Sequence, residues 1–166
     1  MTYMKKLQYS FMFIVVVSTA LLINNMISSY NFKHNPLSNQ IKNELKQKEY
    51  QILQNIKNVY GINAKVPVVI SNKMSNRLYG LCTLDERDKI NIYLNKKMFQ
   101  ESKDYMINDV LPHEYAHALM FIFAKTTNQN GGHTKDWQNI CKNIGGLRCE
   151  RFVDSNDIII SKRDIF

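Results

Sequence analysis

The chain has 166 residues, of which 45% are hydrophobic, and it carries a formal net charge of +8. This length accommodates one domain of ordinary size, and the apolar content excludes an intrinsically disordered chain. The basic residues are scattered from Lys42 to Lys162 without a dense block, so the simplest interpretation of the charge is a solvated surface. A surface that binds nucleic acid or an anionic membrane is the alternative that the charge leaves open.

The N-terminal segment predicts a signal peptide or a single membrane anchor at residues 1–30. Residues 11–27 carry no charge, and Lys5 and Lys6 precede them. A basic start followed by an apolar run is typical of both kinds of segment. A buried core helix is disfavoured, because a helix that is apolar on every side has little protein to pack against at the start of a small chain.

Cleavage and retention of this segment are both compatible with the sequence. The small residues Ser18, Thr19 and Ala20 suit a cleavage site, but cleavage there would leave an apolar core of about seven residues. The full run of about 17 residues is near the lower limit for a spanning helix. We favour a retained anchor, and the positive-inside rule then places the rest of the chain outside the cytoplasm. Residues 31–37, which contain Pro36, are predicted to be a linker.

The segments that follow predict an α+β domain. Apolar residues recur at intervals of three or four, which indicates an amphipathic helix that begins near Ser38 and ends at Gly61. Three short strand patterns come next, at residues 66–70, 78–84 and 90–94. The second of them contains Gly80. Because tight connections join the three, we expect a small antiparallel three-stranded sheet.

A second helix is expected from Ser102, a capping residue, to about Phe123. Pro112 lies inside this segment. An interior proline removes a backbone hydrogen bond and clashes with the preceding turn. The helix is therefore expected either to kink at Pro112 or to begin anew near it.

A third helix is expected after a loop at residues 128–132. Thr134 can cap its start, and Gly145 and Gly146 can end it. Its apolar stripe consists of Trp137, Ile140, Cys141 and Ile144. The remaining chain contains one strand candidate, at residues 158–160.

The three cysteines are Cys82, Cys141 and Cys149, without a Cys-x-x-Cys pair that would indicate a zinc ribbon or a redox centre. Cys141 and Cys149 are close enough in sequence to form a disulfide if the domain is exported. We favour the alternative in which all three are unpaired thiols.

The motif from His113 to His117 carries the strongest functional signal. Residues four apart on a helix face the same way, so these two imidazoles can bind one tetrahedral Zn²⁺. Glu114 can reach a zinc-bound water, accept its proton as it attacks a peptide bond, and pass the proton to the leaving amine. An apolar stretch at residues 118–123 would bury this helix, where unpaired histidines are costly. The motif therefore predicts a zinc metalloendopeptidase with Glu114 as catalytic base, rather than a pair of core histidines.

A catalytic zinc site needs a third protein ligand and an open fourth position. His133 is the first candidate, because a glycine-rich loop delivers it to the start of the third helix. Glu150 and Asp136 are the alternatives, and the remaining histidine, His34, lies in the predicted linker. The longer metzincin motif is excluded, because its third histidine would fall on Phe123.

The sequence resembles the SprT-like metallopeptidases, which include the bacterial SprT proteins and Spartan, a protease that cuts proteins crosslinked to DNA. The resemblance rests on residues 110–119, on residues 132–137 and on the glycine pair near residue 145, and it extends upstream through Gly80. It covers residues 38–152. It implies a minimal zincin-like fold, in which a leading helix, a small sheet, the motif helix and the third-ligand helix pack together.

The resemblance also implies roles for individual residues. His113, His117 and His133 correspond to the zinc ligands of the family, and Glu114 corresponds to its catalytic base. Trp137 matches a bulky aromatic residue that is expected to pack the third-ligand helix onto the motif helix.

The sequence departs from the family pattern in three ways. Thr134 stands where the family commonly has glycine. Residues 153–166 form a tail without the zinc ribbon that usually follows in bacterial SprT proteins. The apolar N-terminal segment suggests a location outside the cytoplasm, whereas known members act inside the cell.

Three functional hypotheses remain. The first is an exported or membrane-tethered zinc endopeptidase, expected to be a monomer, whose protein or peptide substrate adds a strand to the edge of the sheet. The second is an intracellular SprT-type protease associated with DNA, and the third is a zinc-binding module without peptidase activity. In the first hypothesis, residues 11–27 would bind the membrane. Nucleic acid, the partner in the second hypothesis, is possible but not favoured. The candidates for an oxyanion stabiliser are Tyr79, Arg148 and Arg151.

Overall fold

The structure is a computed structural model that describes residues 3–75, 77–124 and 133–150. The chain divides into two compact units, Met1–Pro36 and Leu37–Phe166. The loop predicted at residues 128–132, the strand candidate at residues 158–160 and Arg151 lie outside the described residues.

The first unit is a single helix, α1 (Tyr3–His34), with no buried residue. Among the described residues, α1 is the one helix that is long and apolar enough to cross a membrane, by length and composition only. A signal sequence at an N-terminus meets the same criterion. Residues 31–34, which were predicted to belong to a linker, are the last residues of α1. The helix ends just before Pro36, since a residue that precedes proline avoids the helical conformation.

The second unit begins with the amphipathic helix α2 (Asn39–Tyr60). The Ser38 hydroxyl caps it by accepting a hydrogen bond from the backbone N–H of Ile41 at 3.3 Å. Gly61 ends it with a φ of +70°, a conformation that favours glycine. Both predicted ends of this helix are confirmed.

Three strands form a mixed sheet: β1 (Val68–Ser71), β2 (Gly80–Leu84) and β3 (Ile90–Asn95). Their order is β1-β3-β2, and the central strand β3 runs parallel to β1 and antiparallel to β2. The prediction of an antiparallel sheet is therefore wrong for β1. The chain passes from β1 at one edge of the sheet to β2 at the opposite edge, and the hairpin from β2 to β3 then reverses its direction. The domain is thus α+β, as predicted, with a mixed sheet.

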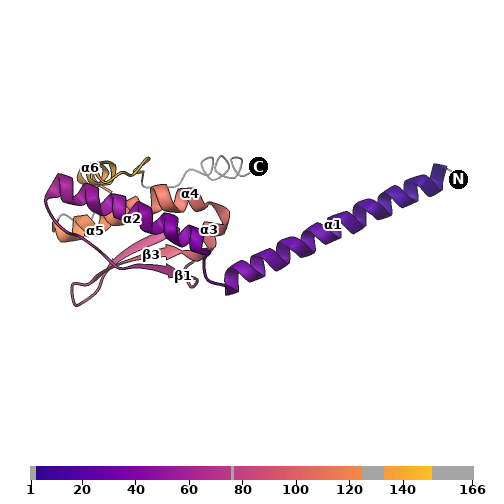
Figure 1. Cartoon of the computed structure of the whole chain (residues 1–166), viewed down its shortest axis with the longest axis horizontal. Coiled ribbons are helices and arrows are strands. Elements are labelled where there is room, and N and C mark those ends of the chain that lie inside the picture. Colours follow the sequence, from indigo (N-terminus) through magenta and orange to yellow (C-terminus); the bar gives the residue numbers. More distant parts are fainter. Residues whose placement is uncertain (1–2, 76, 125–132, 151–166) are drawn as a thin grey trace. The chain divides into compact units, whose positions relative to one another are not determined.

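The helices of the second unit lie on one face of this sheet (Figure 1). Ile92 and Leu94 on β3 point to that face and are fully buried. Val69 and Leu81, which flank Tyr93 in the strand register, lie on the opposite face and are 42% and 44% exposed. The core is therefore on the helical side of the sheet.

A succession of short helices leads from β3 to the motif helix. They are α3 (Lys96–Glu101), α4 (Lys103–Tyr105), the π-helical turn η1 (Met106–Val110) and α5 (Leu111–Ile122). The helix predicted from Ser102 to Phe123 thus comprises α4, η1 and α5, whereas α3 was not predicted. The π-helical turn directly precedes α5, whose second residue is Pro112. The helix therefore has a wider turn next to the residue that cannot donate a backbone hydrogen bond.

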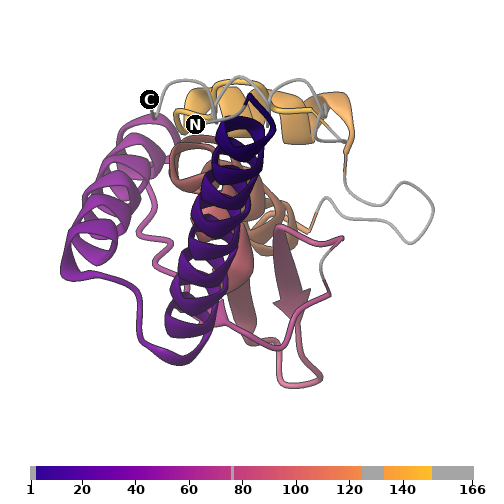
Figure 2. The same cartoon turned by 90° about the vertical axis from the view of Figure 1, so that its right-hand side faces the viewer.

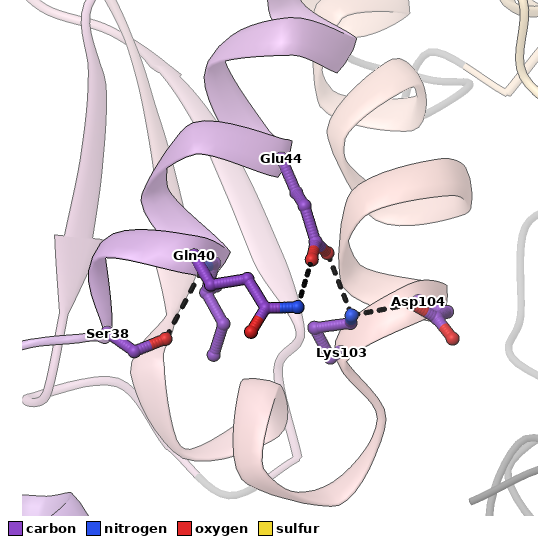
Figure 3. A network of polar contacts seen from close by, with 6 residues as sticks. Ser38, Gln40, Glu44, Lys103 and Asp104 are labelled. Atoms are coloured by element: carbon purple, nitrogen blue, oxygen red, sulfur yellow. Dashed lines mark hydrogen bonds and ion pairs between the residues drawn. The ribbon is translucent and has the colours of Figure 1, made fainter.

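A polar network joins the start of α2 to the start of α4 (Figure 3). The ammonium group of Lys103 lies 2.8 Å from the carboxylate of Glu44 and 3.5 Å from that of Asp104. Gln40 donates a hydrogen bond to Glu44 at 3.0 Å. The hydrogen bond from Lys103 holds the pKa of Glu44 below its ordinary value. These contacts join the leading helix to the segment that precedes η1.

The last described helix is α6 (Lys135–Asn143), which packs on the side of α5 farther from the sheet (Figures 1 and 2). The Thr134 hydroxyl accepts a hydrogen bond from the backbone N–H of Trp137 at 3.3 Å, as expected of a capping residue. A disulfide joins Cys141 to Cys149. The preferred interpretation of three unpaired thiols is therefore wrong, and only Cys82 is free.

Candidate metal centre

Helices α5 and α6 bring three histidines to one point. His113 and His117 are one turn apart on α5, and His133 lies just before α6. The Nε2 atom of His117 lies 3.2 Å from that of His113 and 3.1 Å from that of His133. The Nε2 atoms of His133 and His113 are 3.2 Å apart. The three ring nitrogens therefore form a nearly equilateral triangle.

This triangle fits a metal ion. A tetrahedral zinc bound at about 2.0–2.1 Å holds neighbouring nitrogen ligands about 3.3 Å apart, close to the distances found here. The three nitrogens converge on one point, which is the arrangement that a single metal ion with three imidazole ligands requires. His113, His117 and His133 could thus hold a metal ion together.

The alternative ligands are not part of this cluster. Within residues 3–75, 77–124 and 133–150, the group of side chains that could hold a metal ion consists of the three histidines, without Asp136 or Glu150. His34 belongs to the first unit, at the end of α1.

Burial keeps two of the imidazoles in their neutral form. It lowers the pKa of His113 to about 4, with a smaller contribution from His133. It also lowers the pKa of His117 to about 3, with further contributions from the other two histidines. Both rings are therefore neutral at neutral pH, the form that binds metals. All three histidines are only half-buried, which is compatible with an open position at the site.

Trp137 lies against all three imidazoles. Its ring centroid is 4.6 Å from those of His113 and His133 and 5.3 Å from that of His117. The indole is fully buried, and its N–H has no hydrogen-bond partner among the described residues. The sequence predicted that Trp137 packs α6 onto α5. It did not predict that the same ring contacts the whole cluster.

Glu114 points from α5 towards strand β2. It is only 6% exposed, and burial raises the pKa of its carboxyl group to about 8. A hydrogen bond accepted from the backbone N–H of Cys82 partly offsets this shift. The group next to His113 is therefore a buried carboxyl whose pKa lies near neutrality.

Gly80 makes the approach of β2 to Glu114 sterically feasible. A Cβ atom at this position would lie 2.6 Å from Oε1 of Glu114 and 2.7 Å from its Cγ, closer than real contacts allow. Gly80 was noted in the sequence only as part of a weak strand pattern and of the family resemblance. The close contact with Glu114 explains why position 80 requires a glycine.

Cys82, next but one to Gly80 on β2, is a free thiol near Glu114. Burial raises its pKa to about 12, and the charge of Glu114 contributes to the shift. Cys82 is therefore a neutral thiol at neutral pH.

Two of the three oxyanion candidates lie around one aromatic ring. Tyr79 makes an edge-to-face contact with Tyr105, with ring centroids 5.6 Å apart. The guanidinium carbon of Arg148 lies 5.7 Å from the centroid of the same ring. Burial, followed by the charge of Glu101, raises the pKa of Tyr79. A role of Tyr79 or Arg148 towards a substrate stays a prediction.

Comparison with known proteins agrees with the resemblance seen in the sequence. The model of the SprT-like family matches residues 37–158. Searches of curated proteins and of solved structures found no match. Because the family match spans most of the chain and contains the whole histidine cluster, the chain belongs to the SprT-like family.

Proposed function

We propose that this chain is a zinc-dependent metalloendopeptidase with a minimal zincin-like arrangement at residues 38–152. His113, His117 and His133 are the proposed zinc ligands, and Glu114 is the proposed catalytic base. The observation that carries the proposal is the convergence of three Nε2 atoms within 3.2 Å of one another, with the buried Glu114 carboxyl on the same helix. The family match supports it.

The proposed mechanism divides the chemistry between a metal and the protein. Zinc, when bound, supplies a Lewis acid that activates water and polarises the carbonyl of the substrate. Glu114 accepts a proton from the attacking water and returns it to the amine that leaves. The raised pKa of this carboxyl group suits the second step, in which Glu114 holds a proton and then releases it.

The outer edge of β2 is the proposed substrate-binding edge. The backbone carbonyl of Tyr79 accepts a hydrogen bond from the backbone N–H of Asn95 in β3 at 2.8 Å. In an antiparallel ladder, residue pairs that are hydrogen-bonded to each other alternate with pairs that are not. Gly80 and Cys82 belong to the second kind, so their backbone N–H and carbonyl groups point away from β3. The hydrogen bond from the N–H of Cys82 to Glu114 agrees with this direction. An extended peptide that adds to this edge would pass beside Glu114.

We further propose that residues 11–27 tether the domain to a membrane and that the domain lies outside the cytoplasm. Helix α1 is apolar and unburied, and Lys5 and Lys6 stand near its start. The Cys141–Cys149 disulfide supports the same location, because disulfides persist mainly in oxidising compartments. Recovery of the mature protein from the soluble cytoplasmic fraction would exclude this location and favour the intracellular alternative.

Metal removal tests the proposed function directly. The full chain, purified in detergent, is expected to cleave an unfolded protein substrate, to lose this activity with a chelator and to regain it with added zinc. Magnesium should not restore it, because three imidazoles suit zinc and not a hard cation that prefers oxygen ligands. Cleavage that is unaffected by complete removal of metal would rule the proposal out.

Replacement of Gly80 by Ala is expected to impair catalysis without removing the metal. The new Cβ would displace the Glu114 side chain, to which its three nearest atoms all belong. A displacement of about 1 Å can lower a rate on the order of 100-fold. The measurements are kcat/KM and zinc content. Val69→Ala, on the opposite edge strand and exposed, is the matched control and should keep activity near that of the wild type.

A further inference from the structure

The Cys141–Cys149 disulfide is one helical turn away from the tryptophan at the metal centre. Trp137 and Cys141 are four residues apart on α6, so their side chains lie on the same side of the helix. Both are buried, with exposures of 0% and 1%. The same side of α6 therefore carries the indole that contacts the three histidines and the sulfur that is linked to Cys149.

The surrounding backbone is adapted to this bond. A Cβ atom on Gly146 would lie 2.5 Å from Sγ of Cys141 and 2.8 Å from Sγ of Cys149, so the position accommodates only glycine. Cys149 has a φ of +46°, in the left-handed region that residues with a Cβ rarely adopt. The chain after α6 thus takes an unfavourable conformation where the two sulfurs meet.

Helix α6 depends on such anchors because it is short. It has nine residues, and isolated helices shorter than about 12–15 residues are marginal in water. Two side chains of α2 bind the backbone that follows it: Lys48 donates to the Gly145 carbonyl at 3.1 Å, and Asn55 donates to the Ile144 carbonyl at 3.2 Å. The disulfide adds a covalent link at the same end of the helix.

We propose that the Cys141–Cys149 disulfide positions the metal-binding histidines through Trp137, so that zinc affinity depends on the oxidised bond. When the bond is formed, α6 holds the indole against His113, His117 and His133. When it is reduced, the helix is free to shift and zinc binding weakens. The inference rests on the proposed function, and it makes an oxidising environment a condition for a fully formed metal centre.

The redox step is an ordinary two-electron reduction. Two electrons and two protons convert the disulfide into two thiols. In a cell they would come from a dithiol, which becomes a disulfide itself. In the experiment a phosphine supplies the electrons and takes up the oxygen of water to become a phosphine oxide.

The experiment compares the zinc affinity of the full chain in detergent before and after reduction, by competition with a chelator. Reduction is expected to weaken zinc binding by about 10–100-fold, the usual effect of losing a group that orients metal ligands. The Cys141→Ala/Cys149→Ala variant should bind zinc as weakly without reductant and should not respond to it. Cys82→Ala is the matched control, because a chain that lacks only the free thiol should still respond.

The fluorescence of Trp137 supplies a second measurement. A disulfide that only stabilised the fold would leave the response of this fluorescence to zinc unchanged. Trp137 is the only tryptophan of the chain, so its fluorescence reports from the metal centre alone. Its response to zinc is expected to shrink on reduction. In the oxidised protein, Trp137→Leu should lose affinity and respond little to reduction, whereas Trp137→Phe, which retains a ring, should keep most of the affinity.

The outcomes separate this inference from the proposed function. Equal zinc affinity in the oxidised and reduced wild type, with only a lower thermal stability after reduction, would overturn the inference alone. If Trp137→Leu and reduction lowered the zinc affinity additively, the disulfide would not act on the histidines through Trp137. A wild type that binds no zinc in either state would refute the proposed function and this inference with it.

Discussion

Replacement of Glu114 by Gln is expected to lower kcat/KM for peptide hydrolysis by about 10²–10⁴-fold, the usual contribution of a general base. The amide has nearly the shape of the carboxylate, so it can still accept a hydrogen bond from the backbone N–H of Cys82. It cannot accept a proton from water. The three imidazoles are unchanged, and zinc content should therefore stay at the wild-type level.

The same variant is not expected to be less stable than the wild type. Burial raises the pKa of Glu114 to about 8, so without metal the folded chain must keep a proton on this carboxyl or bury its charge. An unfolded chain would release the proton near the ordinary pKa of a glutamate. Stability of the metal-free wild type is thus lost as the pH rises from that value towards 8. The Glu114→Gln variant carries no such penalty, because its amide does not ionise, and thermal unfolding of the metal-free proteins checks this.

Glu49→Gln is a suitable control for this experiment. Glu49 on α2 accepts a hydrogen bond from the hydroxyl of Tyr115 at 2.8 Å, and a glutamine can accept the same bond. Little change in activity is expected, because the group lies on α2 and does not contact the histidines. If Glu114→Gln kept both zinc and full activity, another group would have to be the base, or the chain would be a zinc-binding module.

The sequence predicted those parts of the site that depend on local geometry. His113 and His117 had to face the same way because a helix has 3.6 residues per turn. The ends of α2 at Ser38 and Gly61 and the start of α6 at Thr134 followed from side chains that complete the hydrogen bonds of a helix end.

The approach of His133 to the motif helix was predicted, but other parts that depend on distant residues were missed or wrong. The parallel pairing of β1 with β3 follows from the order of strands in space, which short connections do not determine. The contact of Gly80 with Glu114 joins two elements more than thirty residues apart. The Cys141–Cys149 disulfide was weighed as an alternative and not favoured, although the two residues are only eight apart.

One missed element had a local signal. Asn95 at the end of β3 caps α3 by accepting a hydrogen bond from the backbone N–H of Lys97 at 3.2 Å. Its amide also donates to the carbonyl groups of Ser75 and Leu78 at 2.9 Å and 2.7 Å, which holds the segment that leads into Gly80. An asparagine directly after a strand pattern is a recognised helix start.

Replacement of His133 by Ala is expected to weaken zinc binding by more than about 100-fold, because even changes in groups that only orient ligands cost about 10–100-fold. The variant removes one corner of the triangle formed by the three Nε2 atoms, while His113 and His117 remain in place on α5. Zinc stoichiometry and chelator competition on the full chain measure the effect, and peptidase activity should fall with the zinc content.

Two matched variants decide whether His133 is the third ligand. Asp136→Ala and Glu150→Ala remove the carboxylates that the sequence left open for this role, and neither lies in the histidine cluster. Both should bind zinc as the wild type does, while His133→Ala does not. Thr134 still caps α6 in all three, so a general loss of this helix would not explain a difference. Full zinc retention by His133→Ala, together with loss in either carboxylate variant, would move the third ligand to that carboxylate. The triangle seen here would then be a packing arrangement and not the metal-bound geometry.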